Sequence, residues 1–93
     1  MIIDSVDDKS EENIFYVYPN PSNSFITIGF KNEKIGSNGD TSLRIMDING
    51  RVVYTQDDIG KLVDVNSFEL GIYYVQLVQN GIVIGVEKFV HVN

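Results

Sequence analysis

The chain has 93 residues, no cysteine, a formal net charge of −6 and a hydrophobic content of 43%. A chain of this length forms one small domain with a thin core. The lack of cysteine excludes disulfides, zinc–thiolate sites and thiol catalysis, and the lack of a basic stripe argues against nucleic-acid binding. No apolar run approaches the ~20 residues of a spanning helix, so we predict no membrane insertion.

Residues 1–13 are acidic and mostly polar, with a net charge of −4 in that stretch. This composition predicts a flexible linker or leader, followed by one domain over residues 14–93. The first residues lack the basic and apolar regions of a signal peptide. We therefore expect the chain to be the last domain of a longer protein.

From residue 14 onward, apolar residues alternate in short runs, which is the pattern of β-strands. The first predicted strand, Ile14–Tyr18, ends at two prolines, which cannot donate hydrogen bonds within a sheet. In the second strand, one face is formed by Ile26, Ile28 and Phe30. Residues 31–40 are polar and rich in glycine and asparagine, so they predict a long loop.

The third predicted strand places Leu43 and Ile45 on one face, and Ile48 has the opposite parity. A bend or bulge near Asp47 would be needed to bury all three side chains. Asn49-Gly50 then predicts a type I′ turn, because both residues tolerate a positive φ. The return strand is predicted over residues 51–55.

Asn80-Gly81 lies between the runs 73–77 and 82–86 and predicts a second hairpin of the same kind. Residues 61–65 predict a short strand, residues 66–70 a turn, and Gly71 a hinge into the next strand. The total is about seven strands. Seven short strands in fewer than 100 residues predict an all-β fold, a small Ig-like antiparallel β-sandwich.

No pattern predicts a catalytic, metal or cofactor site. His91 is the sole histidine and is interpreted as a strand-face residue, because no partner set for nucleophilic catalysis accompanies it. Asp57, Asp58 and Asp64 do not have the spacing of a calcium loop and are interpreted as solvated turn charges. We therefore predict that the chain is not an enzyme.

The five tyrosines raise the alternative of a carbohydrate-binding platform. Strand alternation places Tyr73 on the apolar side with Val75 and Leu77, so a core role is favoured for that ring, whereas Tyr74 is expected to be exposed. Asp47 and Arg51 flank the first predicted turn closely enough to form an ion pair across it. An exposed pair of this kind contributes little stability.

Four segments follow one another along the chain: Tyr18-Pro19-Asn20-Pro21, Asp47-Ile48-Asn49-Gly50-Arg51, Gly71-Ile72-Tyr73-Tyr74-Val75 and Lys88-Phe89-Val90. In this order they resemble the C-terminal sorting domain, type A, of proteins that Bacteroidetes export by the type IX secretion system (Por secretion system). The resemblance covers roughly residues 16–93. Its signature residues are Tyr18, Pro19, Pro21, Asp47, Gly50, Arg51, Asp64, Gly71, Tyr73, Lys88, Phe89, Val90 and Val92. The chain departs from the family pattern at Ser24, where the family often has glycine, and at His91, where it often has a second basic residue.

The resemblance implies a signal domain that targets its parent protein across the outer membrane. Its partners would be the translocon, its outer-membrane shuttle proteins, a sortase-like peptidase and an N-terminal cargo domain. The parent would pass through the periplasm to the cell surface or the medium, and cleavage would fall within or before residues 1–15. We further hypothesise that the Gly81 hairpin and the last strand form the main recognition surface.

The alternative function is an Ig-like or fibronectin-like accessory module of a secreted enzyme or adhesin, which binds carbohydrate or spaces domains. A sorting signal must lie at the extreme C-terminus, whereas a spacer can lie anywhere. Weak homodimerisation through an exposed edge strand stays open.

Overall fold

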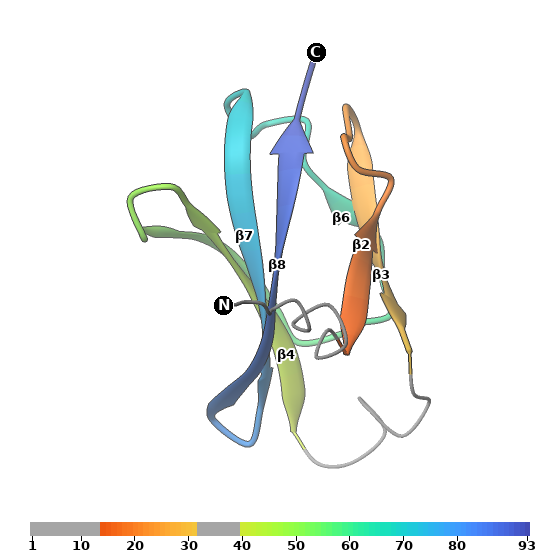
Figure 1. Cartoon of the computed structure of the whole chain (residues 1–93), viewed down its shortest axis with the longest axis vertical. Helices are drawn as coiled ribbons and strands as arrows, with labels where there is room; N and C mark the ends of the chain where they lie inside the picture. The colour runs from red at the N-terminus through yellow and green to blue at the C-terminus, as the bar shows by residue number, and fades with distance from the viewer. Residues whose placement is uncertain (1–13, 32–39) are drawn as a thin grey trace, which may run out of the picture.

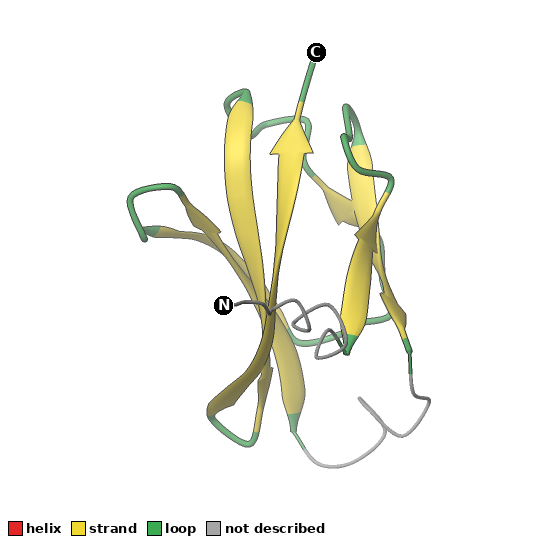
Figure 2. Ribbon diagram, viewed as in Figure 1, coloured by secondary structure: helices red, strands yellow, loops and turns green. Residues whose placement is uncertain are grey.

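The computed structural model describes residues 14–31 and 40–93, which fold into two facing β-sheets (Figures 1 and 2). Within these residues no helix is long and apolar enough to cross a membrane. The predicted leader, residues 1–13, and most of the predicted loop, residues 32–39, lie outside the described residues. The strands are β2 (Phe15–Tyr18), β3 (Phe25–Phe30), β4 (Thr41–Asp47), β5 (Val52–Gln56), β6 (Val63–Asp64), β7 (Gly71–Gln79) and β8 (Ile82–His91).

One sheet has the strand order β2-β3-β6 and the other has the order β5-β4-β7-β8. All neighbouring strands within the two sheets are antiparallel. The prediction of a seven-stranded antiparallel β-sandwich is therefore confirmed. The order of the strands within each sheet was not predicted, because local sequence patterns do not specify which strands become neighbours.

The core lies between the two sheets and follows from the alternation of side chains along each strand. Ile26 and Ile28 of β3 are buried as predicted, and Phe30 packs against the core from a partly buried position. The facing sheet contributes eight buried residues, which are Thr41, Leu43, Ile45, Tyr73, Val75, Leu77, Phe89 and His91.

The two Asn-Gly turns differ. Asn80 and Gly81 have φ values of 54° and 84°, so the type I′ turn predicted there is confirmed. The same prediction for Asn49-Gly50 is wrong, because only Gly50 has a positive φ, at 85°. The Gly50 N–H donates to the Asp47 carbonyl over 3.0 Å and the Asp47 N–H donates to the Arg51 carbonyl over 3.0 Å, which makes a three-residue loop.

Ile48 lies in this loop and is 65% exposed. A register irregularity is present between Ile45 and Met46, one residue before the expected bulge. It does not turn Ile48 toward the core. Ile48 therefore stays at the surface, because the loop begins before the strand parity could reverse.

Candidate recognition surface

The four signature segments meet at one end of the sandwich, the end from which the C-terminus leaves (Figure 1). Asp47 at the end of β4 is the cross-strand neighbour of Tyr73 on β7, and Tyr73 is the neighbour of Phe89 on β8. Ser22, just after the Pro-x-Pro segment, forms a parallel bridge with His91. We call this region the signature end, defined by the segments 18–22, 47–51, 64–73 and 88–92.

At the signature end, the Asp47 carboxylate organises the β4–β5 turn. One oxygen accepts hydrogen bonds from the backbone N–H groups of Asn49 and Arg51, each over 2.9 Å, and the other accepts from the Arg51 Nε over 3.1 Å. The expected ion pair is thus present. The backbone N–H of Arg51 is the main cause that lowers the pKa of Asp47, so this carboxylate is charged at neutral pH.

Tyr73 links this turn to the β6–β7 connection. Its hydroxyl donates to the Glu69 carbonyl over 2.6 Å, and burial is the main cause that raises the pKa of the phenol. Two shallow hollows of about 280 and about 230 Å³ lie beside it. Both hollows are lined in part by the same four residues, Asp47, Arg51, Glu69 and Tyr73.

The Pro-x-Pro segment closes the edge of β8. The Asn20 side chain donates from Nδ2 to the Lys88 carbonyl over 3.1 Å and accepts at Oδ1 from the Val90 N–H over 3.0 Å. The Ser22 N–H donates to the Val90 carbonyl over 2.9 Å, and the Val92 N–H donates to the Ser22 carbonyl over 2.8 Å. Asn20 therefore joins the first signature segment to the last, a role that sequence analysis missed.

Replacing Asn20 with alanine is expected to lower the free energy of unfolding by about 1–2 kcal/mol, because two hydrogen bonds are lost. Amide hydrogen exchange should accelerate at Val90 and stay slower at Val92, which keeps its bond to Ser22. The exposed Asn23 offers the matched Asn23→Ala control, expected to be close to neutral. Equal stability and equal exchange in both variants would contradict the assigned role.

Asp64 and His91, two other residues considered in the sequence analysis, both make contacts within the fold. The Asp64 carboxylate accepts from the backbone N–H and the side-chain Nδ2 of Asn66, both over 2.9 Å, which explains its place before a turn. His91 is buried, with its Nδ1 3.2 Å from the Ser22 carbonyl and its ring against Phe68. Among the described residues, no group of three His, Cys, Asp or Glu side chains is arranged to hold a metal.

Glycine at two signature positions meets a backbone requirement, because Gly50 and Gly71 have positive φ values of 85° and 144°. Ser24 does not need the glycine that the resemblance leads one to expect. Among the described residues, Asn80 is the one non-glycine residue with a positive φ. The departure at Ser24 is therefore compatible with the turn that forms there.

The tyrosines do not act as one group. Tyr73 is in the core, as predicted, and stacks on Phe89 with ring centroids 5.4 Å apart. Tyr74 is half-buried on the outer side of the sheet, less open than expected. Tyr16 and Tyr18 are exposed on the other sheet with their rings 5.5 Å apart. The Tyr16 ring occupies the space that a side chain at position 29 would fill, because residue 29 is glycine. Packing across the two strands therefore explains the position of the Tyr16 ring.

Comparison with protein families identifies residues 16–92 as a secretion system C-terminal sorting domain. Comparison with curated proteins gave no significant match. The family match covers most of the chain and the same four segments that converge in the fold. It is a family of sorting signals for export to the cell surface or the medium, and it is not an enzyme family. The chain therefore belongs to the C-terminal sorting domains of the type IX secretion system of Bacteroidetes.

Proposed function

We propose that the signature end is the surface by which the type IX translocon and its outer-membrane shuttle proteins recognise this sorting domain. The observation that carries the proposal is the convergence of four segments, spread over residues 18–92, at one end of the sandwich. A receptor can bind such a surface only when the domain is folded. The signal is accordingly a three-dimensional one, made of parts that are distant in the sequence.

Two kinds of residue build this surface. Tyr73 and Phe89 are buried and set its shape, and Gly71 permits the backbone path into β7. The exposed members are free to contact a receptor, and they are Tyr18, Pro19, Pro21, Gly50, Arg51, Asp64, Lys88 and Val92. Arg51 stands out among these, because its side chain is 78% exposed and forms its ion pair and hydrogen bond with Asp47 of its own turn.

Of the hypothesis that the Gly81 hairpin and the last strand together form the recognition surface, we retain only the part that concerns the end of the last strand. The Asn80-Gly81 turn begins β8, whereas Lys88–Val92 lies at the far end of that ten-residue strand. At ~3.3 Å per residue, roughly 20 Å separate the two. We therefore assign recognition to the end of β8 and leave the Gly81 turn outside it.

In the proposed route, the parent protein enters the periplasm through an N-terminal signal peptide, folds there and is guided through the outer-membrane translocon. A sortase-like peptidase then cleaves within or before residues 1–15. The domain is the substrate and ligand of these proteins. Cleavage upstream of β2 would leave β2 to β8, the strands of the described residues, uncut.

The experiment is an export assay in a Bacteroidetes host. A signal peptide and a folded fluorescent reporter are fused before residues 1–93 and expressed with and without a working type IX translocon. We expect reporter outside the cell only when the translocon works, with its C-terminal domain removed. Periplasmic retention in both strains, with the domain shown to be folded by circular dichroism, would contradict the proposal and favour the accessory-module alternative.

A further inference from the structure

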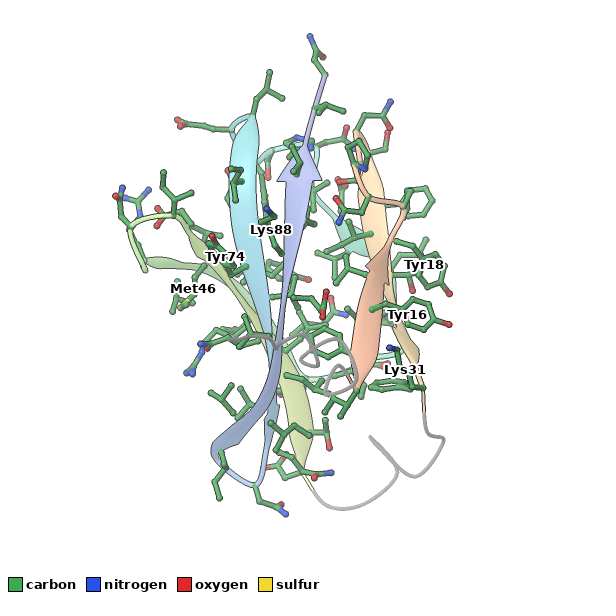
Figure 3. All side chains as sticks on the ribbon, viewed as in Figure 1. Tyr16, Tyr18, Lys31, Met46, Tyr74 and Lys88 are labelled. Atoms are coloured by element: carbon green, nitrogen blue, oxygen red, sulfur yellow. The ribbon has the colours of Figure 1, made fainter. Side chains whose placement is uncertain are left out.

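The outer face of the four-stranded sheet carries a group of apolar and cationic side chains. Met46, Tyr74 and Lys88 form one row across β4, β7 and β8, as the strand register shows and as can be followed in Figure 3. We call this group the outer face, defined by Arg44, Met46, Ile72, Tyr74, Val86 and Lys88. Arg44 and Tyr74 lie between buried neighbours, and the strand register places the other four residues on the same side of the sheet, so these side chains point away from the core.

The charge of the outer face is opposite to that of the chain. The net charge of the protein is −6, yet the outward positions of β4, β5, β7 and β8 carry two cations, Arg44 and Lys88, and no carboxylate. Glu87 has the opposite parity to Lys88 and faces the other sheet, where burial raises the pKa of its carboxyl. A surface of this sign attracts acidic groups.

The outer face is also apolar and open. Ile72 and Val86 are 40% and 48% exposed. Three strands at a spacing of ~4.8 Å and a length of ~20 Å give a face of roughly 300 Å². An exposed apolar patch of several hundred Å² is often an interaction site, and an interface at the small end of the range suits a transient partner.

Near residues 88–92, the edge and the inner side of the last strand are not available to a partner. The Asn20 side chain and the Ser22 backbone occupy its edge near residues 88–92. Its inner side chains, Phe89 and His91, are buried. Whatever contacts this part of β8 must therefore approach from the outer face.

We propose that the outer face docks onto an acidic, partly apolar protein surface of the export machinery, an inference that rests on the proposed function. A membrane is the weaker candidate, because lipid-binding segments typically carry clusters of 4–8 basic residues and this face carries two. A second copy is disfavoured as well, since it would oppose cations to cations. An acidic protein surface matches both the charge and the apolar character of the face.

The test compares two charges at one position. Val86 is 48% exposed and lies opposite Gln76, whose Oε1 accepts from the Arg44 Nε over 2.9 Å, so a longer charged side chain at position 86 can extend into solvent. In the export assay, Val86→Glu is expected to lower export at least about tenfold, and Val86→Lys far less, because like charges repel across an interface. Leu62→Glu, at a 60% exposed position before β6, is the control and should export normally.

The outcomes separate this inference from the proposed function. If the unaltered protein shows no export that depends on the translocon, the proposed function itself is contradicted. Normal export of the unaltered protein together with equal export of Val86→Glu and Val86→Lys would overturn the acidic-partner inference alone, provided that the melting temperatures of both variants match. Tight binding of the isolated domain to anionic phospholipid vesicles would also overturn it, in favour of a lipid surface.

Discussion

Replacing Phe89 with alanine is expected to lower the free energy of unfolding by about 3–5 kcal/mol, the range for removing a fully buried aromatic side chain. Phe89 is 0% exposed and stacks on Tyr73 at an interplanar angle of 20°. Small domains have only about 5–15 kcal/mol of stability in total, so this variant should be close to unfolding. Export should fall with it, because a recognition surface made of distant segments requires the fold.

The measurement is urea denaturation followed by circular dichroism. The chain supplies a matched control in Phe25, which is 41% exposed, so Phe25→Ala removes the same side chain from a solvated position. We expect a cost below about 1.5 kcal/mol for the control, because surface substitutions have small effects. Equal costs for the two variants would contradict the assignment of Phe89 to the core.

The core was predictable because a two-residue period leaves a strong local trace. Ile26 and Ile28 are separated by Thr27, and Val75 and Leu77 by Gln76, and all four apolar side chains are buried. The type I′ turn at Asn80-Gly81 was equally predictable from the sequence. These features depend on residues that are neighbours in the sequence.

The turn at Asn49-Gly50 differs from the predicted type I′ turn for a local reason that the Asn-Gly dipeptide alone does not reveal. Asp47 precedes it by two residues, and its carboxylate accepts the N–H groups of Asn49 and Arg51. An aspartate that binds the backbone two residues later favours a different turn. The aspartate was visible in the sequence, and weighing it would have indicated the three-residue loop.

The docking of residues 20–22 on β8 was not predictable in this way. Asn20 and Val90 are 70 residues apart, and Asn20 between two prolines has the composition of an ordinary turn. The resemblance named Pro19, Pro21 and Val90 as members of one pattern. Their physical connection, through an amide side chain that closes a strand edge, becomes apparent only in three dimensions.

The second large effect is expected on export and concerns Arg51. Arg51→Gln removes the exposed guanidinium, while the backbone N–H of residue 51 remains available to Asp47, so the turn is expected to persist. Little stability should be lost, because exposed ion pairs contribute little. We expect export to fall at least about tenfold, since losing a charged hydrogen bond at an interface has an effect of this size.

The most direct test of the account is therefore the export of Arg51→Gln beside that of Lys61→Gln. Both variants remove one exposed cation. Lys61 lies outside the signature end: the Gln56 side chain donates to its backbone carbonyl, and Gln56 pairs with Leu43, four residues before Asp47. With both domains folded to the same melting temperature, the account predicts that reporter with Arg51→Gln stays inside the cell and reporter with Lys61→Gln leaves it. Equal export of the two would contradict recognition through the signature end.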